Sequence, residues 1–339
     1  MTAAFVSDER DLVQAACAGF AEAHGHLIEM RDDPLHLVAR QRHPGRRVGL
    51  VSGGGSGHEP LHAGFLGRGM LDAVAPGQVF ASPHNRQVYE ASRAAAGPEG
   101  VLHIVKNYTG DRINFGIAAE RLRQDGVAVR RVLVDDDLAT DRDDTATGRR
   151  GTAATVVVEK LLGAAADTGL GLGELAEFGA RVAAASRSLA VASRSYTTLR
   201  AGEPAFELDS GELEYGVGIH GERAATSITR PPLPRLLERM VTDLLTALPP
   251  GDSEVLLVVN GLGSTTALEL YSVFDHVSRI LGDNAVRLAA SLVGTYVAAL
   301  DMRGFSLTLT RLAPGWLDLW RAPAVTPAFP NHHDEVLSR

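Results

Sequence analysis

The chain has 339 residues, of which 45% are hydrophobic and 22% charged, and its formal net charge is −8. This composition excludes a largely disordered chain, and a length of about twice a typical domain predicts two domains. The acidic balance and the lack of a basic block argue against nucleic acid or an anionic membrane surface as a direct partner.

The cysteine content and the first residues bear on the compartment. Cys17 is the single cysteine, so an internal disulfide is excluded and a reducing compartment is favoured. The opening sequence MTAAFVSDERDL reaches acidic residues before any long apolar run, and no apolar stretch is long enough to span a bilayer. We therefore expect a soluble, cytoplasmic protein with no membrane partner.

Strand-like and helix-like segments alternate through the first half of the chain. The predicted strands are 47–52, 77–81, 100–106 and 127–134, and the predicted helices are 85–95, 111–124, 151–168 and 175–186. A glycine loop at 53–57 follows the first of these strands. This order is typical of a mostly parallel sheet with helices on both faces.

A domain boundary is expected near residue 185, beyond the glycine-rich stretch 169–173. Residues 1–185 would then form an N-terminal α/β domain, and residues 186–339 a C-terminal α/β domain. The second half has predicted strands at 188–193, 206–219, 254–260, 286–293 and 305–312, and predicted helices at 233–248 and in a segment ending near 281. The tail after residue 327, with His332 and His333, is expected to fray.

The first motif that could carry chemistry is VSGGGSGHEP, residues 51–60. Glycines after a strand let backbone N–H groups converge on a ligand at the carboxyl edge of a sheet. A phosphate-binding P-loop is excluded because His58, and not lysine, follows Gly57, and the spacing of a dinucleotide fingerprint is absent. A tight structural turn is the alternative, but a titratable side chain at His58 favours ligand binding.

The second motif is IVKNYTGDRINF, residues 104–115, at a predicted strand-to-helix junction. Lys106 ends an otherwise apolar strand, where open α/β sheets place their ligands. Asp111, taken alone, is best interpreted as a helix N-cap. Its alternative role is a general base that accepts a proton from a substrate hydroxyl group.

The third motif is EYGVGIHGE, residues 214–222, in which Gly218 and Gly221 flank His220. Small neighbours allow a ligand to approach the imidazole closely, although a lone histidine is more often structural. No zinc-binding pattern occurs, so no metal site is expected. The acidic run at residues 135–137 could hold Mg²⁺, but a solvated strand end is the interpretation we favour.

Taken together and in this order, the three motifs resemble those of the substrate-binding K subunit of dihydroxyacetone kinases. The matching segments are LVSGGGSGHEPLHAGFLGRGML, IVKNYTGDRINF, VDDD, GRRGTAATVVVEKLLGAAA and GVGIHGE. The resemblance runs from about residue 11 to residue 327, which is nearly the whole chain.

The resemblance implies a role for each site residue. His220 matches a histidine that adds through a ring nitrogen to the substrate ketone and forms a covalent hemiaminal. Asp111 matches the general base toward the hydroxyl group that is phosphorylated, and His58 matches a histidine that hydrogen-bonds this hydroxyl and stabilises the transition state. The further substrate-binding positions that the resemblance implies are Gly55, Ser56, Gly57 and Lys106.

The same resemblance implies the cofactor and the partners. The helical nucleotide domain of fused kinases has no counterpart in this sequence, so we expect no cofactor on this chain and ATP or ADP with Mg²⁺ on a separate L subunit. That L subunit would use ATP, or a permanently bound ADP recharged by a phosphotransferase relay. Because K subunits of this family are homodimers, a homodimer is expected.

Several functions remain open at this point. The leading hypothesis is a phosphotransferase subunit that holds dihydroxyacetone on His220, and a close variant is a subunit for another short ketose such as erythrulose. A ketone-sensing transcriptional co-activator is the alternative from another class, but a sensor has no need of the base Asp111. A lipid-binding relative with the same architecture would require a long apolar tunnel.

Overall fold

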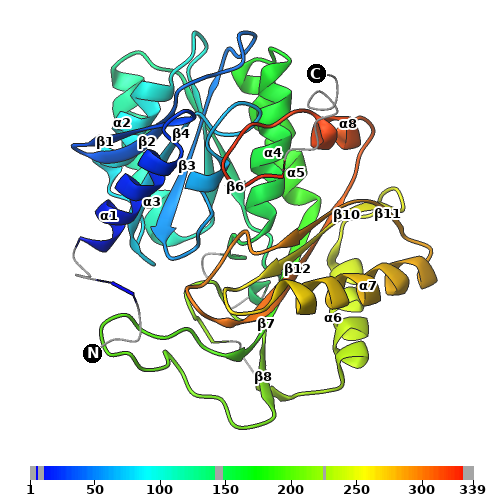
Figure 1. Cartoon of the computed structure of the whole chain (residues 1–339). Coiled ribbons are helices and arrows are strands. Elements are labelled where there is room, and N and C mark those ends of the chain that lie inside the picture. The colour runs from blue at the N-terminus through cyan, green and yellow to red at the C-terminus, as the bar shows by residue number, and fades with distance from the viewer. Residues whose placement is uncertain (1–4, 7–10, 142–147, 224–226, 331–339) are drawn as a thin grey trace, which may run out of the picture.

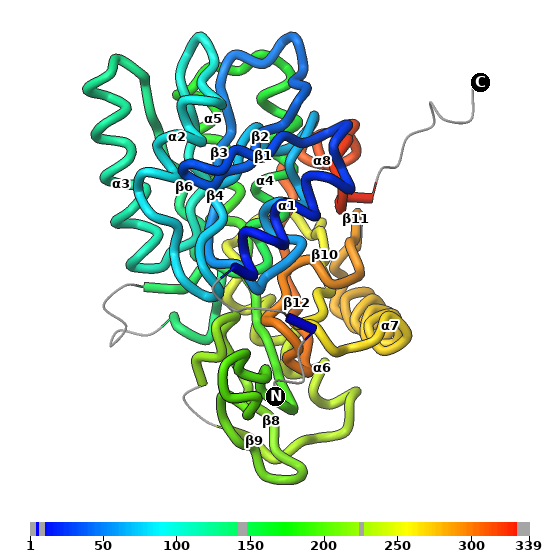
Figure 2. Tube along the Cα trace, turned by 60° about the vertical axis from the view of Figure 1, so that its left-hand side comes forward, coloured from blue at the N-terminus to red at the C-terminus, as the bar shows by residue number. Residues whose placement is uncertain are grey.

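The computed structural model describes residues 5–6, 11–141, 148–223 and 227–330. In these ranges the chain forms two six-stranded sheets with helices packed against them, so the predicted α/β fold is confirmed (Figures 1 and 2). The end of the expected frayed tail, with His332 and His333, lies outside the described residues.

The first sheet has the strand order β1-β2-β4-β3-β5-β6. Its strands are β1 (Ile28–Asp32), β2 (Leu35–Ala39), β3 (Gly49–Ser56), β4 (Ala73–Val79), β5 (Val101–Lys106) and β6 (Val129–Val134). The neighbouring strands in the row β4-β3-β5-β6 all run parallel, whereas β2 pairs antiparallel with both β1 and β4. The carboxyl ends of β3 and β5 therefore meet at one edge of the sheet.

Helices cover both faces of this sheet, as predicted. On one face lie α2 (Asn85–Ala95) and α3 (Thr109–Gln124), and on the other lie α1 (Leu12–Ala23), α4 (Ala154–Asp167) and α5 (Leu172–Ala184). The side chains of β5 alternate between the two faces: Val101 and Val105 pack with α2 and α3, and Leu102 and Ile104 pack with the helices of the other face. A strand buried on both faces is therefore mainly apolar.

The second sheet has the order β11-β10-β12-β7-β8-β9 and is mostly antiparallel. Its strands are β7 (Ser186–Arg194), β8 (Glu212–Tyr215), β9 (Ser227–Thr229), β10 (Glu254–Gly261), β11 (Arg287–Gly294) and β12 (Arg303–Arg311). Helices α6 (Leu233–Ala247) and α7 (Ala267–Asp283) pack on one face through a shared apolar core.

Helix α4 lies between the two sheets (Figure 1). Its apolar cluster includes Leu256 and Val258 of β10 as well as the inner face of the first sheet, and α8 (Trp316–Arg321) packs against it. The first sheet ends at Val134 and the second begins at Ser186, on either side of the expected boundary. The division into two domains at residue 185 stays a prediction.

Several local predictions were wrong. Residues 53–56 of the predicted glycine loop continue β3 and do not form a loop. Of the segment predicted as a strand at 206–219, only Glu212–Tyr215 is a strand. Helix α3 begins at Thr109 with Tyr108 as its N-cap, so the N-cap interpretation of Asp111 is also wrong. Five elements were not predicted from the sequence, namely α1, β1, β2, β9 and α8.

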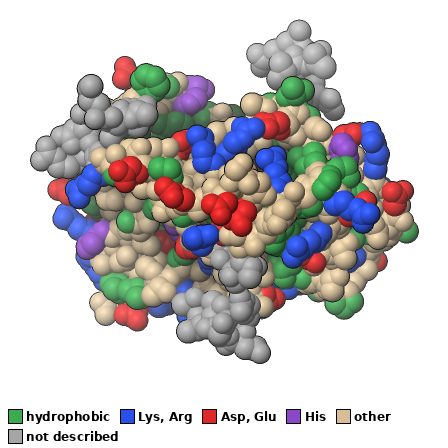
Figure 3. All heavy atoms as spheres, turned by 90° about the horizontal axis from the view of Figure 1, so that it is seen from below, with side chains coloured by type: hydrophobic (Ala, Val, Ile, Leu, Met, Phe, Trp, Pro, Cys, Tyr) green, Lys and Arg blue, Asp and Glu red, His purple; other side chains and the backbone are tan. Residues whose placement is uncertain are grey.

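Two further observations concern the surface. Within the described ranges, no helix combines the length and the apolar character needed to cross a membrane. On the face drawn in Figure 3, acidic and basic side chains are interspersed.

Candidate active site

Four rings from distant parts of the sequence meet at the carboxyl end of β3. The centroid of the His220 ring lies 4.8 Å from that of His58, 4.5 Å from that of Tyr108 and 5.6 Å from that of Phe80. His58 follows β3, Tyr108 follows β5, and His220 belongs to a loop after β8. The structure thus brings two of the three predicted catalytic residues into contact.

His58 has its ionisation state fixed by its surroundings. Its Nδ1 lies 2.8 Å from the carbonyl oxygen of Ala298, and because a carbonyl only accepts, this nitrogen carries the proton. Burial holds the pKa of His58 well below its usual value, and repulsion from a protonated His220 and from Lys106 lowers it further. The buried Nε2 has no hydrogen-bond partner among the described residues, so it is an acceptor available to a ligand.

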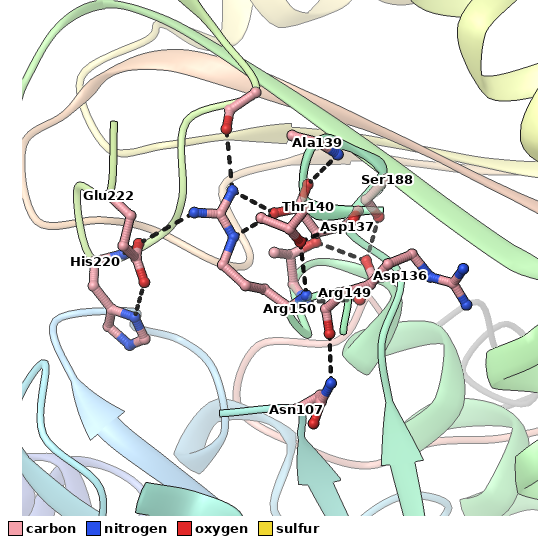
Figure 4. A network of polar contacts seen from close by, with 12 residues as sticks. Asn107, Asp136, Asp137, Ala139, Thr140, Arg149, Arg150, Ser188, His220 and Glu222 are labelled. Carbon is pink, nitrogen blue, oxygen red and sulfur yellow. Dashed lines mark hydrogen bonds and ion pairs between the residues drawn. The ribbon is translucent and has the colours of Figure 1, made fainter. Parts of the chain in front are cut away.

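Glu222 orients His220 through two contacts (Figure 4). The backbone N–H of His220 donates to Glu222 Oε2 at 3.0 Å, and His220 Nδ1 lies 3.1 Å from Glu222 Oε1. A carboxylate accepts, so Nδ1 carries the proton and Nε2 keeps its lone pair. Gly218 makes this arrangement possible, because a Cβ there would lie 2.1 Å from Glu222 Oε2. The His220 side chain is 20% exposed and can be reached by a ligand.

Glu222 stays ionised because of its neighbours. Burial would raise its pKa, but the hydrogen bond from His220, the charge that His220 carries when protonated, and the charge of Arg150 hold it at about 2. Arg150 Nη1 lies 3.8 Å from Glu222 Oε2, while its Nε donates to Asp137 Oδ2 at 2.6 Å and its Nη2 to the Gly216 carbonyl at 3.0 Å. Figure 4 shows this continuous network from Asp137 to His220. Glu222 was not among the predicted site residues, although the third motif contains it.

The acidic run at the end of β6 is not a solvated strand end, and that prediction was wrong. Asp136 and Asp137 are buried. The Asp136 carboxylate accepts hydrogen bonds from the backbone of Thr152 and Ala154 at 2.7 and 3.0 Å, at the start of α4. Burial raises the pKa of Asp137 to about 6, and Arg150 opposes this rise. In the described part of the chain, no group of three or more His, Cys, Asp or Glu side chains could hold a metal ion.

Lys106 ends β5 and Asp111 lies in the first turn of α3, and both are buried. Lys106 Nζ lies 2.7 Å from His62 Nε2, and burial lowers its pKa while the charges of Asp111 and Glu159 raise it. Asp111 is the third residue of α3, where the positive end of the helix dipole stabilises a carboxylate. Its buried Oδ1 has no hydrogen-bond partner among the described residues, so it can accept a proton or a hydrogen bond from a ligand.

The glycine-rich segment has a tightly packed backbone. A Cβ at Gly55 would lie 2.8 Å from the backbone nitrogen of Ala81, and Gly57 has a φ of +98°. Ser56 Oγ donates to the Gly77 carbonyl at 2.8 Å. These residues line a mainly apolar cavity of about 610 Å³ beneath α1, which His58, Asp111 and His220 do not line. The substrate-binding role of Gly55, Ser56 and Gly57 stays a prediction.

Comparison with known proteins identifies the family. Residues 18–328 match the Dak1 domain. The chain belongs to the Dak1 domain family. It is similar to the dihydroxyacetone-binding subunit of a PTS-dependent dihydroxyacetone kinase from Listeria innocua, with 41% identity over 94% of this chain and 97% of the relative. The predicted relationship to K subunits is thereby confirmed.

Two solved structures match the Dak1 fold of this chain. The dihydroxyacetone kinase of C. freundii has a TM-score of 0.89 and 33% identity over 98% of this chain and 61% of that protein, and it has also been solved with AMP-PNP and Mg²⁺. The dihydroxyacetone kinase operon co-activator Dha-DhaQ has a TM-score of 0.89 and 30% identity over 94% of this chain and 98% of that protein. The relatives named kinases are phosphotransferases, which confirms the predicted enzyme class.

Proposed function

We propose that the chain is the dihydroxyacetone-binding subunit of a dihydroxyacetone kinase and that His220 holds the ketone covalently. The observation that carries the proposal is the fixed tautomer of His220. Its Nδ1–H is directed to the Glu222 carboxylate, which leaves Nε2 as a nucleophile beside the neutral His58. The family relationship and the name of the Listeria relative support dihydroxyacetone as the ketone.

The adduct is a hemiaminal. The Nε2 lone pair of His220 forms a bond to the carbonyl carbon, and the C=O π electrons move to oxygen, which takes a proton from solvent. The imidazole then carries a positive charge, and Glu222 stabilises this charge or accepts the Nδ1 proton. A polyol such as glycerol has no carbonyl group to attack, so covalent capture selects ketones and aldehydes. Capture also holds the hydroxyl groups in place for transfer.

Asp111 and His58 act on the captured ketone. We assign Asp111 as the general base, because its Oδ1 is buried, has no partner among the described residues and lies at the helix end nearest the site. His58 Nε2 accepts a hydrogen bond from a hydroxyl group of the ketone, as its tautomer permits. The charge of Lys106 offsets that of Asp111.

The phosphoryl donor comes from a partner in this proposal. The Listeria relative is named as one subunit of a kinase, and this chain spans 97% of it. The C. freundii kinase was solved with AMP-PNP and Mg²⁺, which supports a nucleotide-dependent transfer. We infer an L subunit that carries ATP, or ADP recharged by a phosphotransferase relay, with Mg²⁺. We also propose that this subunit is a homodimer.

A coupled assay tests this function. The purified chain is supplied with dihydroxyacetone, Mg²⁺ and ATP, with and without an L subunit, and the formation of dihydroxyacetone phosphate is followed. Activity only in the presence of the L subunit is the expected result. Robust activity of the chain alone would contradict the assignment of the donor to a partner, and erythrulose in parallel tests the choice of ketose.

A ketone-sensing co-activator is the second candidate, because the co-activator Dha-DhaQ matches this fold as well as the kinase does. A sensor needs capture by His220 but no general base. Normal capture of the ketone combined with no transfer to any L subunit would favour the sensor.

A further inference from the structure

Near Asp111 and His58 of the proposed ketone site, four buried polar side chains from different elements meet in the core. Ser52 lies in β3, His62 in the turn that follows it, Lys106 at the end of β5, and Glu159 in the middle of α4. His62 Nδ1 lies 2.6 Å from Glu159 Oε1 and 3.0 Å from Ser52 Oγ, and His62 Nε2 lies 2.7 Å from Lys106 Nζ. The three titratable groups thus form a hydrogen-bonded series, Glu159–His62–Lys106.

The chemistry of the three groups fixes which atom donates in each hydrogen bond of this series. A lysine ammonium group only donates, so His62 Nε2 accepts from Lys106 and the proton of His62 is on Nδ1. That proton is donated to the Glu159 carboxylate. A neutral imidazole therefore connects one buried cation with one buried anion. Burial alone lowers the pKa of Lys106 and raises that of Glu159, and the charge of each group opposes the shift of the other.

Stability gives no reason for this arrangement. Buried ion pairs lose solvation, and replacing them with packed apolar side chains is often neutral or stabilising. The Lys106 ammonium has three N–H bonds, and His62 is its one hydrogen-bond partner among the described residues. It also lies against the backbone of Gly54, where a Cβ would lie 2.2 Å from Nζ. Two N–H bonds thus remain for a ligand next to Asp111, whose charge raises the pKa of Lys106.

We propose that Glu159 and His62 are positioning residues that hold Lys106 as an ammonium ion in the ketone site, where its remaining N–H bonds donate to oxygen atoms of the ketone. The inference rests on the proposed function for the identity of the ligand. Removing Glu159 should leave Lys106 in place but make it lose its proton at a lower pH. The other charged or titratable groups that act on Lys106 or lie beside it are Asp111 of α3 and the histidines His58 and His62 after β3.

The sequence offers a direct readout, because Lys106 and Lys160 are the only lysines in the chain. Protein labelled with ¹³C at the lysine Cε position gives two signals, and Lys160→Arg assigns them. The pH titration of the Lys106 signal is then compared between wild type and Glu159→Gln. A lower midpoint in Glu159→Gln is expected, and an unchanged midpoint, or an uncharged Lys106 in wild type at neutral pH, would overturn the proposal.

Controls separate positioning from general core damage. His103→Gln changes a different buried histidine, which lies in β5 and is hydrogen-bonded to Ser92, and it should leave the Lys106 midpoint unchanged. If Glu159→Gln does not fold, the same pH titration of the Lys106 ¹³C signal is measured in His62→Gln. These titrations need no ketone, so they test the positioning role even where the proposed function fails.

A double-mutant cycle on ketone affinity completes the test. Lys106→Met should weaken ketone binding by roughly 10-fold or more, the range for a hydrogen bond from a charged donor. Glu159→Gln should act only through Lys106, so adding it to Lys106→Met should change affinity little further. Glu159→Gln alone should also lose affinity at a lower pH than wild type. Additive losses with an unshifted pH profile would show a merely structural role and refute the proposal.

Discussion

Gly54→Ala is a single-methyl perturbation of the centre of this site. The new Cβ would lie 2.2 Å from Lys106 Nζ and 3.3 Å from His62 Nε2, whereas ordinary contacts begin at 3.4 Å. Lys106 cannot withdraw freely, because its ammonium group is hydrogen-bonded to His62 at 2.7 Å in a fully buried position. Relieving this contact requires a movement of about 1 Å, either of β3 or of the ammonium group away from the new Cβ.

Both outcomes cost stability. Forcing an extra methyl group into a packed core costs about 1–3 kcal/mol. A buried donor that loses its partner costs about 1–3 kcal/mol more. We expect the free energy of unfolding of Gly54→Ala, measured by urea denaturation, to fall by about 2 kcal/mol or more. The ¹³C signal of Lys106 should shift in the same variant.

Gly116→Ala is the matched control, because a Cβ at Gly116 in α3 has nothing within 4 Å. Alanine in a helix interior is about 0.5–1 kcal/mol more favourable than glycine, so this variant should be slightly stabilised. An unchanged unfolding midpoint and an unshifted Lys106 signal in Gly54→Ala would refute the packing argument. An equal loss in Gly116→Ala would show that the cost is not specific to Lys106.

Two further variants test the roles of other residues. Asp111→Asn should still capture the ketone, while phosphoryl transfer with a competent L subunit falls about 10²–10⁴-fold, the range for general acid–base groups; unchanged transfer in the coupled assay would rule out a base at this position. Burial lowers the pKa of His103 from 6.5 to about 3, so the unfolded chain binds more protons in this range and stability is lost as the pH falls from 6.5 toward 3. His103→Gln should make the fall in unfolding free energy over this pH range shallower, and an equally steep fall would contradict this reasoning.

Local sequence patterns predicted the elements that depend on local signals. The predicted helix at 85–95 coincides with α2, whose polar start and Gly97-Pro98 stop are visible in the sequence. The glycines of β3 were misassigned because glycine has no strand preference of its own. Glycine is required at position 53 because the neighbouring strand β4 packs closely: a Cβ at Gly53 would lie 2.4 Å from the Ala75 carbonyl oxygen.

The candidate site was predictable where a motif contained its residues, and it was not where partners come from distant elements. His58 and His220 were singled out by their glycine neighbours, and the structure places them in contact. Asp136 was misjudged because its donors belong to the start of α4, sixteen residues further along the chain. Glu159 carries no signal in an apolar helix, and only the fold brings it to His62.

The central claim is covalent capture by His220, and ¹³C NMR of dihydroxyacetone labelled at its carbonyl carbon tests it most directly. On mixing with wild-type protein, we expect the carbonyl signal to give way to a tetrahedral-carbon signal that reverts on dialysis and that borohydride does not trap. His220→Ala, mixed with the same ligand, should show only the unbound ketone. A tetrahedral adduct that persists in His220→Ala, or a wild-type protein that binds the ketone with its carbonyl signal intact, would contradict the account.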